Sequence, residues 1–476
     1  MSLAFGTSGW RAVIAEEFTF ANVRRVCRAI AQHVGAEAGR AGAGGGAPVL
    51  LVGYDTRFLS ERFARAAAEA LTAGGVRAEL CDGAAPTPAV AAYVVRHGLA
   101  GAVTITASHN PPEYNGVKFT PASGGPALPE ITRAIQARIA ATDVIVPPPP
   151  GAPPPPPPVV VADVDPRPEY LDQLAGLTDL DVIRRARGKV ALDPMYGASR
   201  GYLDAIFGRA GARIQLLHHW RDPYFGGRRP DPDSDGLREL STAVSGSDAV
   251  LGLATDGDGD RFGVVDEDGT FVVPNVVLAL LLDYLARTRK WRGAVARSVA
   301  TTHLIDAVAA AHGLDVRETP VGFKYIGEFL ASGAVVFGGE ESAGLSIAGH
   351  VPDKDGILAC LLVAEMVAAT GKSLAELTDA LFRRVGPRYS ARIDLAVTDR
   401  VATRLASVSA DPPVRLAGLT VRDVTRIDGC KLLLEDGARL LFRPSGTEPL
   451  VRCYAEAASA GQRGAVIAAG RELLGA

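Results

Sequence analysis

The sequence predicts an α/β protein of several domains, because a strand–loop–helix–strand pattern recurs three times along the chain. Each copy begins with a short β-branched run, continues through a polar loop into an amphipathic helix, and reaches a glycine before the next strand. That order is typical of a βαβ unit, whose two strands lie parallel in one sheet. The elements are, in chain order, a strand from Val49, a helix from Glu61 and Gly74; a strand from Val190, a helix through Phe207 and Gly211; and a strand from Ala294, a helix through Ala311 and Gly313.

A chain of 476 residues is too long for one core, so roughly two to four domains are expected. The run Pro147 to Pro158 is proline except for Gly151 and Ala152, and such a run favours an extended, semi-rigid spacer over a docking motif for a proline-binding domain. We predict three similar α/β/α domains with mixed, largely parallel sheets, followed by a C-terminal α+β domain. The predicted bounds are 1–146, linker 147–158, 159–263, 264–386 and 387–476.

The composition narrows the class of protein. Hydrophobic residues make up 47% and charged residues 22%, which is typical of a soluble globular chain. With 50 basic and 53 acidic residues the net charge is −3, so we expect neither nucleic acid nor a membrane as partner. The five cysteines show no C-x-x-C spacing, and the N-terminus lacks the apolar run of a signal peptide. We therefore expect reduced thiols and a cytoplasmic location.

Ligands of parallel α/β sheets bind outside the carboxyl ends of the strands, so chemistry is expected in the loops that follow strands. The first such loop places Ser108 in a tight turn with Asn110. It lacks the Gly-x-Ser-x-Gly pattern of a hydrolase, so Ser108 is a candidate phosphate carrier if a cation lies opposite. His109 could orient it, and Lys118 is a candidate for proton transfer or phosphate contact. The alternative is a β-turn with an incidental Ser and His.

The second loop carries Asp256, Asp258 and Asp260 on alternate residues, separated by glycines. Hard oxygen ligands in that number suit Mg²⁺, which would keep an open position for a phosphate oxygen. An EF-hand is disfavoured, because its sixth position needs glycine and is Arg261 here, and because strands flank the loop. A solvated Asp/Gly hairpin turn is the other alternative. Arg261 favours the phosphate interpretation, since a guanidinium can clamp an anionic oxygen.

A third loop, Gly338-Gly-Glu-Glu-Ser-Ala-Gly after a predicted strand Ala334-Val-Val-Phe, offers Glu340 and Ser342 to sugar hydroxyls. His350 and Lys354 follow it, before a helix that starts near Gly356. A nearby loop carries Lys324. On residue types alone, a Glu/Gly turn and a solvated lysine are open alternatives.

The fourth loop gathers a guanidinium, hydroxyls and open backbone N–H groups in Arg443, Ser445, Gly446 and Thr447. This combination suits a phosphate dianion, and Arg452 on the following strand could add a second cation. A structural β-turn with one ion pair is the alternative.

Taken together, these loops resemble the α-D-phosphohexomutase family, in particular its phosphoglucomutase and phosphomannomutase members. The resemblance is carried by five stretches that stand in the family's order and span nearly the whole chain. They are Gly6-Thr-Ser-Gly-Trp-Arg, Thr106-Ala-Ser-His-Asn-Pro, Asp256-Gly-Asp-Gly-Asp-Arg, Gly339-Glu-Glu-Ser-Ala-Gly and Arg443-Pro-Ser-Gly-Thr-Glu-Pro.

The resemblance implies four domains around a central cleft, each contributing one loop. Ser108 would be the phosphoserine, with an oxygen of its phosphate on the Mg²⁺ that the three aspartates hold. The resemblance also implies Arg11 near the phosphoserine; Glu340 and Ser342 on the sugar; Arg443, Ser445, Gly446 and Thr447 on the non-reacting phosphate; and Lys118, His350 or Lys354 in proton transfer. From their residue types we add Lys324 and Arg452 as candidate substrate contacts, Arg261 on the transferring group and His109 as a candidate catalytic residue.

The implied reaction interconverts hexose 1-phosphate and hexose 6-phosphate through a hexose 1,6-bisphosphate. Glu341 is similar to glucose-type members, whereas glucosamine-type members tend to carry Gln there, so glucose is our first expectation and mannose a second. A phosphoglucosamine mutase, a non-catalytic sugar-phosphate sensor and a Mg²⁺ phosphatase are the alternatives. We expect a monomer or homodimer, with hinge motion near Pro387.

Overall fold

The computed structural model describes all residues except 1–2, 7–8, 41–45, 142–161, 187 and 447–448, so the predicted linker over 147–158 lies outside the described residues. The chain divides into two compact units. Unit 1 comprises residues 1–272, 330–333 and 343–373, and unit 2 comprises residues 273–329, 334–342 and 374–476.

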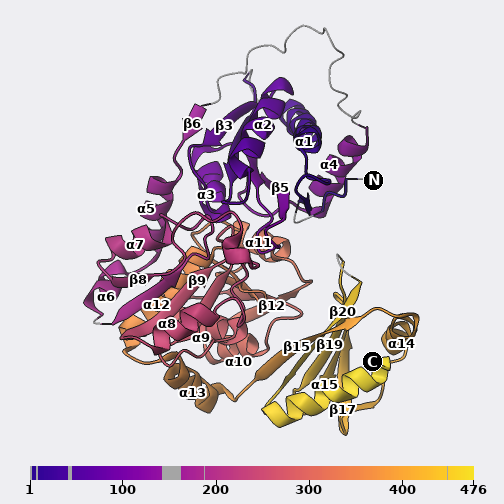
Figure 1. Ribbon diagram of the computed structural model, residues 1–476. Helices are drawn as coiled ribbons and strands as arrows, with labels where there is room; N and C mark the ends of the chain where they lie inside the picture. Colours follow the sequence, from indigo (N-terminus) through magenta and orange to yellow (C-terminus); the bar gives the residue numbers. More distant parts are fainter. Residues whose placement is uncertain (1–2, 7–8, 41–45, 142–161, 187, 447–448) are drawn as a thin grey trace. The chain divides into compact units, whose positions relative to one another are not determined.

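The first sheet of unit 1 has six strands in the order β1-β5-β4-β2-β3-β6. Figure 1 labels its strands β3, β5 and β6. Strands β4, β2, β3 and β6 run parallel, whereas β5 is antiparallel to both β4 and β1. Helix α1 packs against α2 and α4. The elements are β1 (Trp10–Val13), α1 (Phe20–Arg40), β2 (Val49–Tyr54), α2 (Ser60–Ala73), β3 (Arg77–Cys81), α3 (Thr87–His97), β4 (Gly101–Ile105), β5 (Tyr114–Pro121), α4 (Pro129–Ala141) and β6 (Ala162–Val164).

The second sheet of unit 1 has the order β10-β9-β7-β8. Strands β9, β7 and β8 are parallel, and β9 and β10 form an antiparallel hairpin. The remaining elements of unit 1, of which β14 is not a strand of this sheet, are α5 (Arg167–Leu177), α6 (Leu180–Arg185), β7 (Lys189–Asp193), α7 (Leu203–Arg209), β8 (Arg213–Leu216), a 3₁₀ turn η1 (Phe225–Gly227), α8 (Arg238–Ser245), β9 (Ala249–Thr255), β10 (Phe262–Asp266), β14 (Gly344–Ile347) and α12 (Gly356–Thr370).

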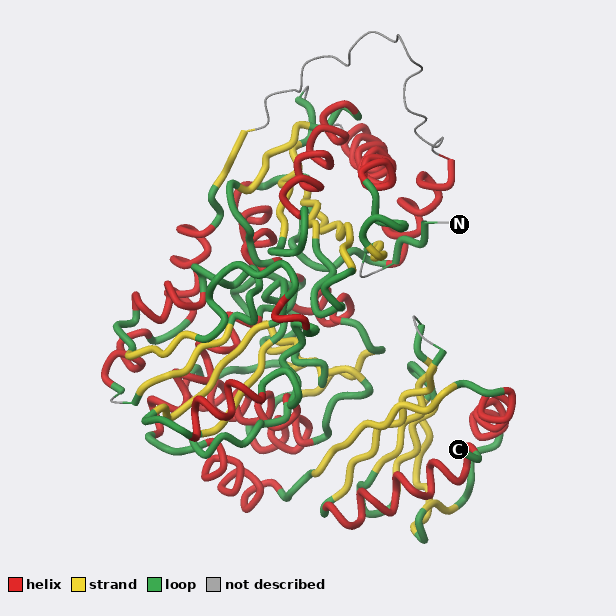
Figure 2. Tube along the Cα trace, in the orientation of Figure 1, coloured by secondary structure: helices red, strands yellow, loops and turns green. Residues whose placement is uncertain are grey.

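Unit 2 contains the parallel strands β12, β11 and β13, with β11 in the middle. It ends with a six-stranded antiparallel sheet of order β15-β20-β19-β18-β17-β16, along which α15 lies (Figures 1 and 2). The elements are α9 (Pro274–Thr288), β11 (Ala294–Ser298), α10 (Leu304–Ala311), β12 (Asp315–Thr319), α11 (Phe323–Ala331), β13 (Phe337–Glu340), α13 (Leu374–Val385), β15 (Tyr389–Ala396), α14 (Asp399–Ala410), β16 (Arg415–Leu416), β17 (Leu419–Thr425), β18 (Cys430–Leu434), β19 (Arg439–Pro444), β20 (Leu450–Ala457) and α15 (Ala460–Leu474).

The predicted fold class and the three predicted βαβ copies are confirmed. Strands β2 and β3, β7 and β8, and β11 and β12 pair in parallel, each pair joined by a helix. The glycines that end the helices are present as predicted, and Gly211 and Gly313 adopt left-handed φ angles of 70° and 67°, where side chains with a Cβ are disfavoured.

One predicted strand is placed too early. The apolar run Ala334-Val-Val-Phe predicts a strand that ends before Gly338, but the observed strand is Phe337–Glu340. The sheet pairing begins where Phe337 lies opposite Val295, and Val335 is buried before the pairing begins. The apolar run therefore includes buried residues that precede the strand, and Glu340 is the last residue of the strand.

Helix α12 positions the loop that precedes it. Its sequence is apolar on every side, and it is buried along most of its length, which is typical of a core helix. Asp355 caps its start by accepting a hydrogen bond from the Leu358 N–H at 2.9 Å, and Gly371 ends it at φ 64°. No single helix in the described part of the chain is long and apolar enough to cross a membrane; α12 and α13 reach that threshold only when taken together.

Candidate functional site

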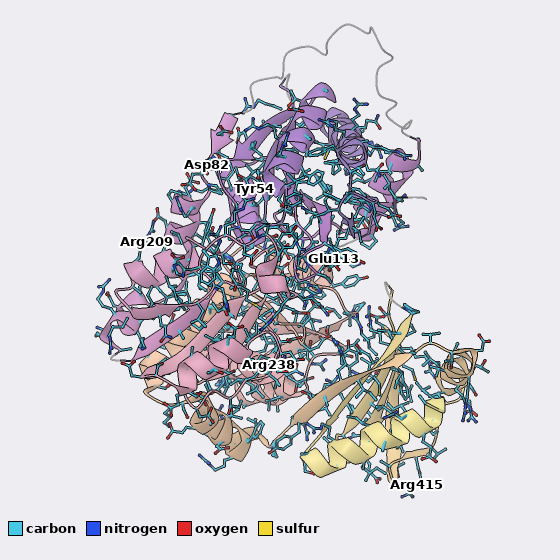
Figure 3. The ribbon with its side chains drawn as sticks, viewed as in Figure 1. Tyr54, Asp82, Glu113, Arg209, Arg238 and Arg415 are labelled. Atoms are coloured by element: carbon cyan, nitrogen blue, oxygen red, sulfur yellow. The ribbon has the colours of Figure 1, made fainter. Side chains whose placement is uncertain are left out.

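Ser108 lies in the loop between β4 and β5, which also contains the labelled Glu113 in Figure 3. Its side chain is buried, and its backbone is left-handed at φ 52°, a conformation disfavoured for a residue with a Cβ. The Ser108 N–H donates to Thr106 Oγ1 at 2.9 Å, and Ser108 Oγ donates to Asp256 Oδ2 at 2.7 Å. The loop therefore aims the hydroxyl at the aspartate cluster, although the two residues are far apart in sequence.

A buried arginine, which the sequence analysis did not single out, holds this loop in place. Arg57 follows β2, two residues after Asp55, and both side chains are fully buried. Four hydrogen bonds run from the guanidinium to backbone carbonyls of the loop. The acceptors are Ser108 at 2.6 Å, Asn110 at 2.7 Å, Pro111 at 2.7 Å and Tyr114 at 3.0 Å.

Asp55 completes this support. Its carboxylate accepts from Arg57 Nε at 3.1 Å, from Ser60 Oγ at 2.9 Å and from Thr106 Oγ1 at 2.7 Å. A fork of five N–H donors is needed to reach one carboxylate and four carbonyls at once, which a lysine cannot do. Arg57 could have been found in the sequence, because the Asp-x-Arg pair directly follows a parallel strand. The carboxyl ends of such strands form the edge of the sheet where functional residues are expected.

Asp256, Asp258 and Asp260 lie in the turn of the β9–β10 hairpin, and all three are buried. One carboxylate oxygen from each lies within 4.8 Å of the others, so the group could hold a metal ion; it is the one such group among the described residues. Asp256 Oδ1 accepts from the Arg261 N–H at 3.0 Å, and Asp258 Oδ2 accepts from Thr87 Oγ1 at 2.9 Å. Oδ1 of Asp258 and Oδ1 of Asp260 are buried with no hydrogen-bond partner.

Two orphaned carboxylate oxygens beside a third carboxylate form a donor set that fits a hard divalent cation. Burial raises the pKa of Asp256 well above its ordinary value, and the neighbouring Asp258 and Asp260 raise it further, whereas the Arg261 charge lowers it. The close approach to Ser108 depends on Gly257, since a Cβ there would lie 2.6 Å from the Ser108 carbonyl oxygen.

Two predicted lysines lie beside the cluster. Lys354 Nζ donates to Asp260 Oδ2 at 2.8 Å, and Lys118 Nζ donates to Asp353 Oδ2 at 3.2 Å and lies 3.9 Å from Asp260 Oδ2. Burial lowers the pKa of Lys354, but Asp260 and Asp353 outweigh that effect and raise it. Asp353, which sequence reasoning missed, thus holds the Lys118 ammonium beside the aspartates, and its other oxygen accepts from the Lys354 backbone N–H at 2.8 Å.

The three remaining predicted groups of the phosphoserine region also lie here. Arg11 Nη1 donates to Asn110 Oδ1 at 2.8 Å, and His109 Nδ1 lies 3.2 Å from Ser108 Oγ. Burial, together with the nearby Arg261 and Arg11 charges, holds the pKa of His109 well below its usual range, so its imidazole is neutral. Arg261 Nη1 lies 3.7 Å from Asp231 Oδ1.

His350 occupies a different position. Its fully buried ring contacts Asp355 Oδ2 at 2.7 Å and the Gln173 side chain at 3.2 Å. Asp355 also accepts from the Tyr170 hydroxyl at 2.8 Å and caps α12. The structure thus places His350 in a buried polar contact at the start of α12, with Asp355 between its ring and the helix, and brings Lys118 and Lys354 rather than His350 to the aspartates.

In unit 2, Glu340 is buried at the end of β13, and its Oε1 accepts from the Gly322 N–H at 2.7 Å. Glu341 Oε2 accepts from Ser298 Oγ at 3.0 Å and Thr301 Oγ1 at 3.1 Å. Ser342 follows in the turn, half-buried. Lys324 lies in the first turn of α11, with its ammonium 4.9 Å from the centre of the Tyr325 ring.

The predicted phosphate loop lies between β19 and β20, also in unit 2. Arg443 and Arg452 are directly opposite each other across these antiparallel strands, so their side chains leave the same face of the sheet. Two guanidinium groups on one face of the sheet suit an anionic ligand, and Arg443 Nε also donates to Asp428 Oδ2 at 2.7 Å. The Ser445 N–H donates to the Leu450 carbonyl at 2.8 Å, one position beyond the pairing of Pro444 with Val451. Thr447 lies outside the described residues.

Family models cover most of the chain. They are described as phosphoglucomutase/phosphomannomutase alpha/beta/alpha domain I, domain II and domain III and C-terminal domain, and they match residues 2–145, 168–269, 273–385 and 395–470 in that order.

Curated relatives and solved structures agree with this match. The chain is 33% identical to a phosphoglucomutase of Komagataeibacter xylinus, over 95% of this chain and 87% of that one, and 32% identical to a phosphoglucosamine mutase of Salinispora arenicola, over 96% and 95%. A crystal structure from Thermus thermophilus, described as a candidate phosphomannomutase, is 35% identical with a TM-score of 0.85 and covers 100% of both chains.

More distant chains share the fold. One is Aspergillus fumigatus N-acetylphosphoglucosamine mutase, crystallised with GlcNAc-6P and magnesium, which is 14% identical with a TM-score of 0.58 over 100% of this chain and 95% of that one. Since the family models match most of the sequence and relatives above 30% identity span nearly its whole length, the chain belongs to the phosphoglucomutase/phosphomannomutase family, whose members are phosphohexomutases.

Proposed function

We propose that this protein interconverts hexose 1-phosphate and hexose 6-phosphate, with glucose as its preferred sugar, through phospho-Ser108 and a hexose 1,6-bisphosphate. The observation that carries the proposal is the 2.7 Å hydrogen bond from Ser108 Oγ to Asp256, inside a buried cluster of three carboxylates. A phosphoryl group on Ser108 would therefore be attached directly beside a candidate cation site.

Asp256, Asp258 and Asp260 would hold Mg²⁺, and the ion would supply positive charge for the oxygens of the transferring phosphoryl group. The residues of the chain provide the rest. Arg57 and Asp55 keep the Ser108 loop rigid, and Lys118 and Lys354 add cationic N–H donors at the same edge of the cluster.

In the first half-reaction, the free hydroxyl of the sugar attacks the phosphorus of phospho-Ser108. A bond forms between that hydroxyl oxygen and phosphorus, the bond from phosphorus to Ser108 Oγ breaks, and the hydroxyl proton is transferred so that Ser108 Oγ ends protonated. The bisphosphate then turns over, and its other phosphoryl group returns to Ser108 by the reverse chemistry. Lys118 and Lys354 are the predicted proton-transfer residues that lie beside the aspartates.

The sugar preference rests on Glu341. Residue 341 is the position at which glucose-type members are expected to carry Glu and glucosamine-type members Gln. Here Glu341 Oε2 accepts hydrogen bonds from the Ser298 and Thr301 hydroxyls, so Glu340 and Ser342 are the predicted contacts to sugar hydroxyls. A phosphoglucosamine mutase is the second candidate, because a relative of that name is 32% identical over nearly the whole chain. Turnover of glucose 1-phosphate, mannose 1-phosphate and glucosamine 1-phosphate, measured side by side, separates the three substrates.

The test of the reaction is Ser108→Ala, assayed by coupling glucose 6-phosphate formation to a dehydrogenase. We expect kcat to fall by at least about a thousandfold, because the phosphoryl carrier is lost. Ser123→Ala is the matched control, since Ser123 is an exposed serine of the same sheet region. Dialysed wild-type protein should regain activity with added glucose 1,6-bisphosphate.

Three results would contradict the proposal. Near-wild-type turnover in Ser108→Ala would exclude the phosphoserine. Release of inorganic phosphate as the main product would indicate a phosphatase, and binding of all three sugar phosphates without turnover of any would indicate a sensor.

A further inference from the structure

Asp428 lies in the turn that leads into β18, followed by Gly429. Gly429 is left-handed at φ 94°, and a Cβ on it would lie 2.2 Å from the Phe442 carbonyl oxygen and 3.1 Å from Arg443 Cα. Only glycine allows the backbone to approach β19 this closely. The Asp-Gly pair therefore brings the Asp428 carboxylate next to Arg443, the predicted phosphate-binding arginine.

One oxygen of Asp428 joins two parts of unit 2. Asp428 Oδ2 accepts from Arg443 Nε at 2.7 Å and from the backbone N–H of Val321 at 3.1 Å. Val321 belongs to the segment between β12 and α11, and Arg443 to the far end of β19. Because Nε of the guanidinium points at Asp428, the planar fork fixes the direction of its two Nη groups.

The contact continues to the predicted sugar loop. Gly322 follows Val321, and its N–H donates to Glu340 Oε1 at 2.7 Å. Two successive peptide N–H groups therefore bind two carboxylates, Asp428 on one side and Glu340 on the other. A continuous path of short hydrogen bonds and one peptide unit connects Arg443 with Glu340.

A second contact makes this region rigid. Arg439, which is fully buried, donates to the carbonyls of Val299 at 2.7 Å, Ala300 at 3.0 Å and Thr301 at 2.7 Å. The Thr301 hydroxyl in turn donates to Glu341. The antiparallel sheet thus contacts the segments that hold both glutamates of the sugar loop.

We propose that Asp428 is a positioning residue that orients Arg443 toward a sugar phosphate group and, through Val321 and Gly322, holds Glu340 in place for a sugar hydroxyl. This inference rests on the proposed mutase function. The phosphate group and the sugar then bind to residues whose positions are already fixed. The Asp428 carboxylate connects Arg443, on the phosphate, with Glu340, on the sugar. Asp428 itself does not contact the substrate.

The test is Asp428→Asn, which keeps the shape of the side chain but removes the charge that orients Arg443. We expect KM for glucose 1-phosphate to rise on the order of tenfold, the cost of one charge-assisted hydrogen bond, while kcat changes less than about threefold. Asp423→Asn is the matched control, because Asp423 is an exposed aspartate on the neighbouring β17 and its carboxylate accepts only the Val424 N–H among the contacts described.

A double-mutant cycle separates positioning from general structure. An asparagine amide oxygen can still accept from the Val321 N–H, so Asp428→Asn mainly perturbs Arg443 and should raise KM less than about twofold once Arg443 is replaced by alanine. Additive effects of the two changes, or an Asp428→Asn enzyme that behaves like Asp423→Asn, would overturn the inference. Failure of the wild-type protein to interconvert any hexose phosphate would instead contradict the proposed function, so the two failures are distinguishable.

Discussion

Replacement of Arg57 by lysine tests whether the Ser108 loop is held by the buried guanidinium. Lysine keeps the charge beside Asp55 but has one nitrogen instead of a planar fork, so it must abandon at least two of the four carbonyls that Arg57 binds. At about 1.5 kcal/mol for each hydrogen bond from a charged donor, the loss is about 3 kcal/mol. For unit 1, which contains Arg57, an unfolding entropy of about 2.1 cal/mol/K per residue converts this loss to a Tm lower by about 5 °C.

The same change should also reduce catalysis, because Ser108 and Asn110 lose their backbone anchors. A displacement of the nucleophile by about 1 Å lowers kcat by about a hundredfold. Differential scanning fluorimetry and the coupled mutase assay measure the two effects. Arg77→Lys is the control, since that arginine is 67% exposed and pairs with Glu79 at 3.4 Å, so neither quantity should change. An Arg57→Lys protein with wild-type Tm and kcat would refute the role of Arg57.

Three further predictions concern metal binding, thiols and pH. Asp258→Asn should raise the Mg²⁺ concentration for half-maximal activity at least about tenfold in a metal titration, because a buried carboxylate ligand is lost; unchanged Mg²⁺ dependence would contradict the metal site. All five cysteines are buried, and burial raises the pKa of Cys27 and of Cys453 to about 12. A thiol reagent should therefore react with the unfolded protein but not with the native one, and a thiol that reacts fast in the native protein would contradict this prediction. The hydrogen bond from His218 to Asp193, at 2.9 Å, raises the pKa of His218, and the contact with Glu239 at 3.0 Å raises it further. The stability that the charged His218 adds to the fold is therefore complete below the ordinary histidine pKa and is lost as pH rises through the raised pKa. His218→Gln should lower Tm more at about pH 6 than at about pH 9, and an equal loss at both pH values would contradict this.

The parts of the site that are local in sequence could be predicted from it. The three aspartates stand on alternate residues of one hairpin turn, and Ser108 follows an apolar strand, so residue type, spacing and strand ends were sufficient. The βαβ copies were predictable for the same reason, since each is a continuous segment that ends at a glycine.

The supporting residues could not be predicted in this way, because their partners are distant in sequence. Arg57 binds Ser108 across 51 residues, Lys118 reaches Asp353 across 235, and Val321 reaches Asp428 across 107. The position of Arg57 and Lys118 after or within strands marks them as candidates, but a single sequence does not show which distant residue each of them contacts. His350 illustrates the same limit, since its ring direction depends on its packing against Asp355 and Gln173. The hinge near Pro387 stays a prediction.

The most direct test of the account is to map the phosphoryl group. The protein is incubated with glucose 1,6-bisphosphate and Mg²⁺, digested, and its peptides are weighed by mass spectrometry. We expect one phosphoryl group on the peptide that contains Ser108, located on that serine by fragmentation, and we expect it to disappear when excess glucose 1-phosphate is added. An active enzyme whose Ser108 stays unmodified, or whose phosphoryl group lies on another residue, would contradict it.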